Sequence, residues 1–322
     1  MSNHSPIQRG LHKITRICLL AFLKAGGFQL LNCVRKRKVL ILAYHGFTNS
    51  KSSRHLQSSL FEQQIKFLKK HYNIITLDDF FSYKQGKGSI PKNSVIITID
   101  DGYRNVYSQI FPILKKCAVP ASLFLATGFI GTKKFQWADE LRCLLGCAGV
   151  DKNEIELTIS KLKRASAVEI NVALKAAKEN AKLSDCKTAK RDAEEYGFMN
   201  WTQVDKMANT KINFYPHGHN HFILSRLDAP TIKNELKMSL AAINKRFKNK
   251  NNYFAYPNGL ARDFDERTIA VLKQQDIKLG LTMLPGYNDR NTNDYLLKRI
   301  SMGELKDMNS FLIRINFPGL FL

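Results

Sequence analysis

The first 61 residues contain no acidic side chain, and Glu62 is the first carboxylate in a chain of 322 residues. The same stretch holds ten of the 50 Lys and Arg residues, whereas the whole chain has 27 Asp and Glu residues and a formal net charge of +23. This asymmetry indicates a polyanionic partner: a nucleic acid, an acidic membrane surface or a phosphate-bearing substrate. Composition alone does not choose among the three.

The chain also lacks paired CxxC clusters, internal repeats and low-complexity tracts. The missing CxxC pairs argue against a zinc-finger site. Aromatic residues are not interleaved with the basic runs and no nucleic-acid motif is present, so we do not expect a nucleic-acid partner. The scattered cysteines predict reduced thiols in a cytosolic compartment; they are Cys18, Cys33, Cys117, Cys143, Cys147 and Cys186.

Residues 1–38 have no uninterrupted apolar run of the length that crosses a membrane. Ile17–Leu23 is apolar, but Lys24 ends it after seven residues, and a spanning helix needs about 20. An apolar stretch flanked by Lys and Arg, with no acids, favours an amphipathic helix at an anionic membrane surface. A signal anchor and a helix packed on the domain are the alternatives.

From residue 39 onward, apolar strands alternate with helical patterns. Val39–Ala43 is fully apolar, and Ser94–Ile99 and Ala121–Ala126 are mostly apolar, which is typical of buried parallel strands in an α/β fold. Residues 139–200 are charged, helical in pattern and without buried strands. We therefore predict one domain over 39–322 with a helical insertion at about 139–200.

Polar clusters follow several of the predicted strands. His45 follows the first, Asp100 and Asp101 follow the strand over 94–99, and His217–His221 and Tyr256–Asn258 follow two weaker strands. The carboxyl ends of parallel strands form one face, where active sites are built in barrels and open sheets alike. We expect these clusters to share a site.

Asp100 and Asp101 need different partners, because two adjacent carboxylates repel each other. A divalent cation separates their roles, since one Asp can bind the metal while the other acts as a general base. His217 and His221 are four residues apart, a spacing suited to a common metal. Two His and one carboxylate leave positions open for water and substrate, as at catalytic zinc, and an activated water can attack a carbonyl.

These residues carry a resemblance to a known family. The segment Ile97–Tyr103 (ITIDDGY) resembles the first motif of the NodB-homology polysaccharide deacetylases. His217–His221 (HGHNH) resembles their second motif, and Phe254–Gly259 (FAYPNG) resembles their third. Their order and spacing also match, as do Leu42–Gly46 and Leu297–Ile300. The resemblance covers about residues 39–303 without the insertion.

The resemblance implies a deformed (β/α) barrel and metal-dependent removal of an N-acetyl or O-acetyl group from an amino sugar of the GlcNAc or GalNAc type. Asp100 would be the general base, and Zn²⁺, or else Co²⁺, Ni²⁺ or Mn²⁺, would bind Asp101, His217 and His221. The expected substrate contacts are Tyr256, Pro257 and Asn258 along a sugar groove, and the Tyr103 backbone N–H at the oxyanion.

The chain departs from the family pattern in two places. Many members have an Arg in the third motif where this chain has Ala255. We expect Arg299 to orient the base instead and to be among the substrate-binding residues. Many also have a late Leu-x-His motif whose His protonates the leaving amine, but no His follows His221. His45 is therefore our candidate for the general acid, with His219 as the alternative.

The basic N-terminus and the thiols together predict an enzyme bound peripherally to the cytoplasmic face of the bacterial inner membrane. Its substrate would be a lipid-linked sugar or a surface polysaccharide precursor. Two alternatives remain: a periplasmic polymer deacetylase anchored by its N-terminus, and an inactive glycan-binding domain of the same fold.

Overall fold

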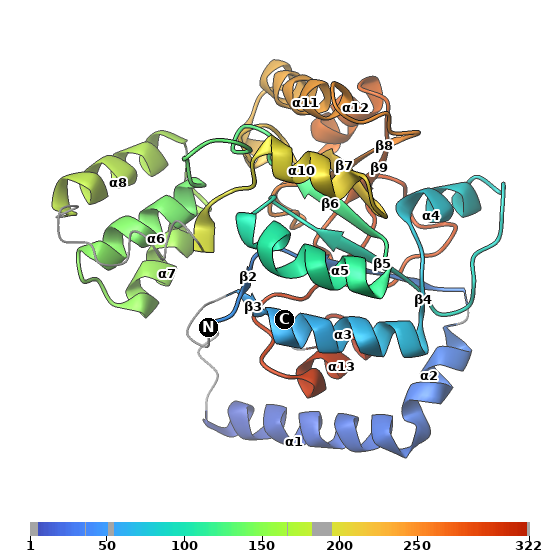
Figure 1. The fold of residues 1–322 in the computed structure, drawn as a ribbon. Helices are drawn as coiled ribbons and strands as arrows, with labels where there is room; N and C mark the ends of the chain where they lie inside the picture. The colour runs from blue at the N-terminus through green and yellow to red at the C-terminus, as the bar shows by residue number, and fades with distance from the viewer. Residues whose placement is uncertain (1–5, 36, 51–54, 166, 182–194, 321–322) are drawn as a thin grey trace.

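A parallel sheet lies at the centre of the molecule (Figure 1). The computed structural model describes residues 6–35, 37–50, 55–165, 167–181 and 195–320. The strand order is β10-β1-β5-β6-β7, with β4 paired to β5, and every pair is parallel. These strands are β1 (Val39–Tyr44), β4 (Asn73–Ile74), β5 (Ser94–Ile99), β6 (Ala121–Leu125), β7 (Ile212–Pro216) and β10 (Ile300–Ser301).

Two shorter parallel pairs extend this arrangement. β8 (Asn252–Ala255) pairs with β9 (Ile277–Leu281), and β8 lies beside β7. β2 (Phe47–Thr48) pairs with β3 (Leu56–Gln57) near the end of β1. β7 and β8 lie side by side, although no strand ladder joins them among the described residues. The result is the parallel α/β architecture that the apolar strands predict.

The long strands β1, β5 and β6 are buried at every position, because one side of each faces the interior and helices cover the other. The covering helices are α3 (Ser58–His71), α4 (Leu77–Lys84), α5 (Phe111–Cys117), α10 (Trp201–Ala208), α11 (Ala229–Asn244), α12 (Glu266–Gln274) and α13 (Met308–Asn316). A π-helical turn, Val106–Ile110, precedes α5, and a short 3₁₀ helix, Leu224–Arg226, precedes α11. β10 and α13 have no counterpart among the elements expected from sequence.

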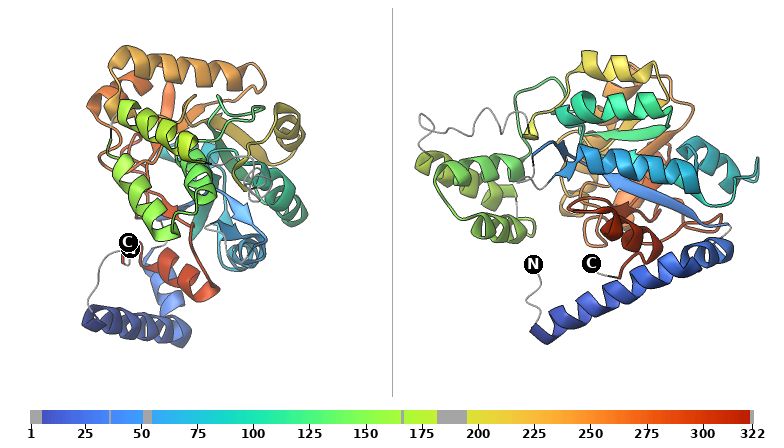
Figure 2. Two further views of the ribbon diagram at one scale, coloured as in Figure 1. Left: turned by 90° about the vertical axis from the view of Figure 1, so that its left-hand side faces the viewer. Right: turned by 60° about the horizontal axis from the view of Figure 1, so that its bottom comes forward.

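The expected insertion consists of three described helices, α6 (Trp137–Cys147), α7 (Lys152–Leu162) and α8 (Ala167–Asn180). They stand beside the sheet and its covering helices (Figures 1 and 2). They bury a small core of their own, to which Leu141, Leu144, Ile155 and Ile159 contribute. Residues 182–194 of the expected insertion lie outside the described residues.

One cysteine departs from the expected reduced state. Cys147, at the end of α6, is disulfide-bonded, whereas Cys18, Cys33, Cys117 and Cys143 are free. The prediction of reduced thiols is therefore wrong for Cys147. Spacing along the chain could not reveal this bond, because pairing depends on which cysteines meet in space.

The N-terminal segment is helical and bent. α1 (Pro6–Phe22) leads through a π-helical turn, Leu23–Gly27, into α2 (Phe28–Val34). Gly26 has a φ of 102°, a conformation that glycine adopts readily, and the chain changes direction there (Figure 1). Ile14–Leu31 has the length and composition of a membrane span, with only 11% of it buried. This window includes Lys24, so the uninterrupted apolar run is still the short one described from the sequence.

This bent segment is attached to the domain along one side. Arg16 pairs with Asp307 at 3.4 Å, and the Phe28 ring packs edge-on against Phe67 and Tyr72. Figure 2 shows α1 running beside α13 rather than projecting away from the body. These contacts fit the alternative of a helix packed on the domain.

Candidate active site

His45 and Asp100 lie side by side because the strands before them are in register. Tyr44 is the partner of Ile99 in the β1–β5 pair, and the Asp100 N–H continues the ladder by donating to the Tyr44 carbonyl at 2.8 Å. His45 Nε2 lies 3.7 Å from Asp100 Oδ2. The Asp100 side chain is 1% exposed and that of His45 is 37% exposed, so His45 lies on the open side.

Asp101 points away from Asp100 because the backbone turns sharply there. Its φ is 70°, a left-handed conformation that is uncommon outside glycine, and Gly102 follows with a φ of 94°. The Asp101 carbonyl accepts the N–H of Ala126, just beyond β6, at 3.1 Å. This turn directs the two adjacent carboxylates to different partners, at a strain of about 1–3 kcal/mol.

The histidine loop, residues 217–221, is attached to the end of β6. The His217 N–H donates to the Leu125 carbonyl at 2.9 Å, and the Gly128 N–H donates to the His219 carbonyl at 2.8 Å. Gly128 permits this close approach, since a Cβ there would lie 2.7 Å from that carbonyl oxygen. The loop ends at His221, whose φ of 55° again turns the chain.

Asp101, His217 and His221 form a potential metal site, with one ligand atom from each lying within 4.8 Å of the others. Asp101 Oδ1 is 3.2 Å from His221 Nε2 and 3.6 Å from His217 Nε2. His217 Nδ1 donates to the Ala255 carbonyl at 2.7 Å, so the other ring nitrogen faces Asp101. One carboxylate and two imidazoles fit a catalytic zinc-type site.

Electrostatics favour the protonation states that a cation requires. Burial lowers the pKa of His217 to about 4, against the opposing influence of Asp100, so the imidazole is neutral at pH 7. The pKa of Asp101 lies below its ordinary value: burial raises it, but the hydrogen bond from His221 and the nearby histidines more than offset this. Both groups are therefore in their metal-binding forms.

Asp100 is paired with a fully buried arginine. Arg299, 0% exposed, donates from NH1 to Asp100 Oδ1 at 2.8 Å, and its NH2 lies 2.8 Å from Asp100 Oδ2. Its Nε donates to the Thr282 carbonyl at 2.9 Å, which fixes the guanidinium. Burial raises the pKa of Asp100, but Arg299, His217 and His45 together lower it below its ordinary value. Arg299 occupies the orienting position that we expected for it, but it does not face a groove.

The other expected substrate residues fall into two groups. The Tyr256 side chain is fully buried, stacks on Phe264 and donates its hydroxyl to a backbone carbonyl, so it cannot line a sugar groove. The Tyr103 hydroxyl is also buried and donates to Asp139 of α6 at 2.6 Å. Pro257 is buried, whereas Asn258 is half-buried and open to a ligand. The role expected for the Tyr103 backbone N–H stays a prediction.

Three polar contacts in the site have no counterpart in the sequence prediction. Gln136, the residue before α6, donates to Asp101 Oδ1 at 3.1 Å and ties the insertion to a metal ligand. His219 Nδ1 lies 3.0 Å from the Thr127 hydroxyl. Glu235 of α11 binds the histidine loop. Glu235 alone had a signal in the sequence, because it occupies an apolar helix face between Ile232 and Leu236.

Comparison with known proteins identifies the family. The family model for polysaccharide deacetylase matches residues 87–280, which is more than half of the chain. The chain belongs to the polysaccharide deacetylase family. It is therefore a hydrolase that removes acyl groups from glycans, and the expected family resemblance is confirmed.

Individual relatives agree with this assignment. The poly-beta-1,6-N-acetyl-D-glucosamine N-deacetylase of Staphylococcus aureus is 30% identical over 274 residues, covering 84% of this chain and 76% of the relative. The Staphylococcus epidermidis protein of the same name is 45% identical over 76 residues, 23% of this chain and 26% of that protein. The first match spans most of both proteins.

Solved structures confirm the fold. The Streptococcus pyogenes deacetylase PplD aligns with a TM-score of 0.61 at 18% identity, covering 88% of this chain and 100% of that one. IcaB from Ammonifex degensii aligns with a TM-score of 0.60 at 18% identity, covering 88% and 98%. The parallel sheet described above is thus the deformed barrel of this family.

The two histidines at positions 217 and 219 make a direct test of the metal site. We expect His217→Ala to weaken Zn²⁺ binding by more than about 100-fold, beyond what loss of an outer-shell partner usually causes. His219→Ala is the matched control and should bind Zn²⁺ like the wild type, because its Nδ1 faces Thr127. Competition with a fluorescent chelator measures both. Equal losses in the two variants would contradict the ligand assignment.

Proposed function

We propose that this enzyme is a metal-dependent deacetylase that removes N-acetyl groups from an amino-sugar polysaccharide. One observation carries the proposal: two adjacent carboxylates have separate partners. Asp101 lies with His217 and His221 in a cation-binding arrangement, whereas Asp100 is held by Arg299. An inactive glycan-binding domain would not need separate partners for the two carboxylates. Their separate partners therefore disfavour the inactive alternative.

The chain's own residues supply the proton transfers. A divalent cation bound by Asp101, His217 and His221 would act as a Lewis acid toward water and the amide carbonyl. Asp100 is ionised and held rigidly, so it can accept a proton from the attacking water. Arg299 fixes the orientation of the Asp100 carboxylate through two contacts at 2.8 Å.

His45 is placed to protonate the leaving group. Water adds to the acetyl carbon, the C–N bond breaks, acetate leaves, and the amine nitrogen takes up a proton. His45 lies 3.7 Å from Asp100 and is exposed on the open side, which suits an acid that meets the amine. The ring of the alternative acid, His219, is engaged by Thr127, which makes it the weaker candidate.

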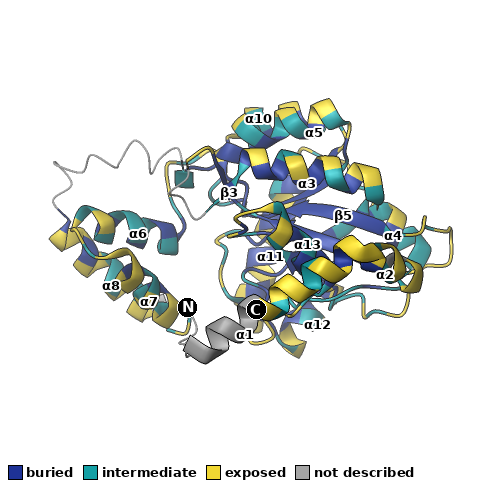
Figure 3. Cartoon of the chain, turned by 90° about the horizontal axis from the view of Figure 1, so that it is seen from below, coloured by how far each residue is buried: buried dark blue, intermediate teal, exposed yellow. Residues whose placement is uncertain are grey.

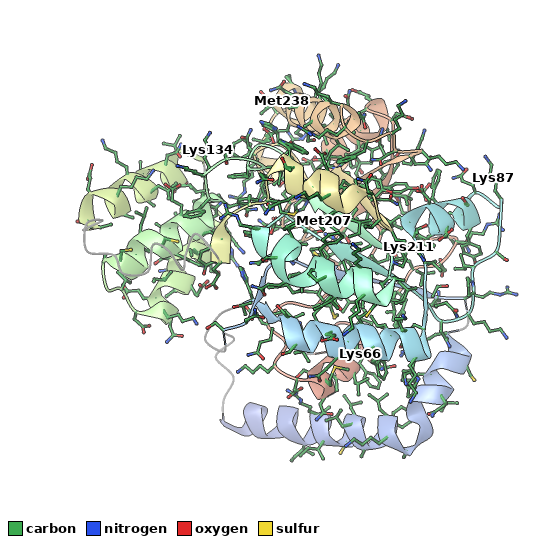
Figure 4. The ribbon with its side chains drawn as sticks, viewed as in Figure 1. Lys66, Lys87, Lys134, Met207, Lys211 and Met238 are labelled. Carbon is green, nitrogen blue, oxygen red and sulfur yellow. The ribbon has the colours of Figure 1, made fainter. Side chains whose placement is uncertain are left out.

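The substrate that the relatives favour is a polymer of N-acetylglucosamine, because the staphylococcal proteins are poly-beta-1,6-N-acetyl-D-glucosamine N-deacetylases. The net charge of +23 does not by itself select a phosphate-bearing substrate. Figure 4 shows four of the lysines, Lys66, Lys87, Lys134 and Lys211, well apart from one another. We therefore place the polymer ahead of the lipid-linked sugar.

Acetate release from purified oligomers tests the reaction. Asp100→Asn should lower kcat by about 10²–10⁴-fold on β-1,6-linked N-acetylglucosamine oligomers, the range that a general base contributes. Asp205→Asn, which removes an exposed carboxylate on α10, is the control and should leave kcat unchanged. A fully active Asp100→Asn enzyme would contradict the assignment of Asp100 as the general base. Turnover of lipid-linked N-acetylhexosamine but not of the oligomers would contradict the proposal of a polymer substrate.

We further propose that the bent N-terminal segment lies on a membrane surface. Its outward side is apolar on both helices, with Ile14 60%, Ile17 58% and Phe22 41% exposed on α1, and Leu30 58% and Val34 78% exposed on α2. These positions follow helical spacing and so form a stripe on each helix. Figure 3 shows much of this segment exposed when the molecule is seen from below.

Burial of apolar side chains contributes more to the free energy of this membrane attachment than charge does. Arg16 is paired with Asp307, Lys38 with Asp289, and Arg35 with Asn316, so these three basic side chains already have partners in the domain. The opposite side of the segment is packed on the domain, which favours an interfacial position over a spanning one. The surface need not be strongly anionic.

The disulfide at Cys147 favours the extracytoplasmic side of that membrane. Disulfides persist in oxidising compartments and are rare in the cytosol. A polymer substrate agrees with this location, because finished surface glycans lie outside the cytoplasm. We therefore favour the alternative of an extracytoplasmic enzyme held by its N-terminus over the cytoplasmic face.

Vesicle binding tests the attachment. Ile17→Ser and Val34→Ser should each weaken partitioning onto lipid vesicles by about tenfold, since burial of one such side chain contributes about 1.5–3 kcal/mol. Leu157→Ser removes an equally exposed apolar side chain from α7 and is the control. If all three variants cosediment with vesicles like the wild type, this surface is not the site of attachment.

A further inference from the structure

The histidine loop carries two of the three expected metal ligands, and a single side chain from another element binds its middle. Glu235 of α11 accepts the backbone N–H of His219 at 3.0 Å and that of Asn220 at 2.8 Å through Oε2. Its Oε1 accepts the side-chain amide of Asn220 at 2.5 Å. All three donors lie between the ligands His217 and His221.

Glu235 is an unusual residue at this position. Its side chain lies on the buried face of α11, and the residue is 3% exposed. None of the ion pairs formed within the described part of the chain includes it, so three N–H donors compensate the buried carboxylate. Burying a carboxylate is costly unless it is well hydrogen-bonded. Such a residue restricts the loop far more than an apolar one would.

The histidine loop needs contacts from outside because its own backbone does not hold its conformation. Gly218 and His221 both have positive φ, of 78° and 55°. His217 is fixed by the Leu125 and Ala255 carbonyls, but no hydrogen bond among the described residues holds the backbone of His221. The Thr127 and Gly128 N–H groups hold the carbonyls of residues 218 and 219. Glu235 adds the only contacts to the N–H groups of residues 219 and 220 among the described residues, and these are the contacts nearest to His221 along the chain.

We propose that Glu235 is a positioning residue for the metal site, which sets the distance between the two histidine ligands through the backbone between them. The proposal rests on the proposed metal-dependent function. It assigns to α11 a role in metal affinity in addition to its place in the core.

A graded set of variants tests this. Asn220→Ala removes one of the three bonds from an exposed residue and should weaken Co²⁺ and Zn²⁺ binding slightly. Glu235→Gln places an amide opposite the Asn220 amide, and Glu235→Ala removes all three bonds. Glu235→Ala should weaken binding by about 10–100-fold, as is usual for outer-shell partners. Competition titration gives the affinities, and the visible spectrum of the Co²⁺-loaded protein reports ligand geometry.

A compensating pair distinguishes positioning from stability. Asn220→Asp combined with Glu235→Gln reverses the donor and acceptor between the two side chains and should restore the affinity that Glu235→Gln loses. Ser239→Ala, on the same buried face of α11, is the control for helix packing, because its hydroxyl bonds within its own helix. It should leave the affinity and the Co²⁺ spectrum unchanged.

The outcomes separate this proposal from the one it rests on. One outcome is that the wild type binds Co²⁺ while the Glu235 variants, including Glu235→Gln, show the same Co²⁺ affinity and the same spectrum. In that case Glu235 is only structural and the proposal is wrong. If the double variant of Asn220→Asp and Glu235→Gln does not recover metal affinity, the positioning role of the contact between these two side chains is wrong as well. If the wild type binds neither Co²⁺ nor Zn²⁺, the metal-dependent function itself fails.

Discussion

Asp100 and Asp101 are adjacent, buried and both held in the ionised form, and the rest of the site keeps their charges apart. The left-handed turn at Asp101 sends the second carboxylate toward two imidazoles, while the first meets the Arg299 guanidinium. Two buried carboxylates without separate partners would not both stay ionised. The Asp101–imidazole contacts and the Asp100–Arg299 pair therefore depend on each other. A base and a cation-binding carboxylate can therefore coexist on consecutive residues.

Partners for this pair come from distant parts of the chain. Arg299 follows β9 and precedes β10, His217 follows β7, and Gln136 introduces the insertion. The parallel sheet brings them together, because β1, β5 and β7 all end on one side. The insertion thereby acquires a direct link to the site, since Gln136 donates to Asp101 Oδ1. The sheet and the insertion therefore both help to fix the position of the Asp101 carboxylate.

Much of this was predictable from sequence for a physical reason. Strands buried on both sides are continuously apolar, so their ends, and the polar residues after them, can be located without a structure. The same logic fails for Tyr256, whose ring packs inward against Phe264. It also fails for β10, which has only two residues, and for the disulfide at Cys147, since neither leaves a periodic pattern.

Glu235 and Gln136 illustrate a further limit. Each acts through hydrogen bonds to a loop that another strand positions, and the sequence around each carries no motif. A carboxylate within an apolar helix face signals a buried partner but not which one. The basic N-terminus shows the converse, because the sequence reveals its charge while only the structure shows that several of those charges already pair with the domain.

The division of roles between the two carboxylates is the central claim, and anomalous diffraction from a crystal of the Zn²⁺-loaded enzyme tests it most directly. The predicted result is one zinc peak with Asp101, His217 and His221 as protein ligands at about 2.0–2.2 Å. Asp100 should lie outside the coordination sphere and remain paired with Arg299. A zinc ion bound by Asp100, or located away from these three ligands, would contradict the account.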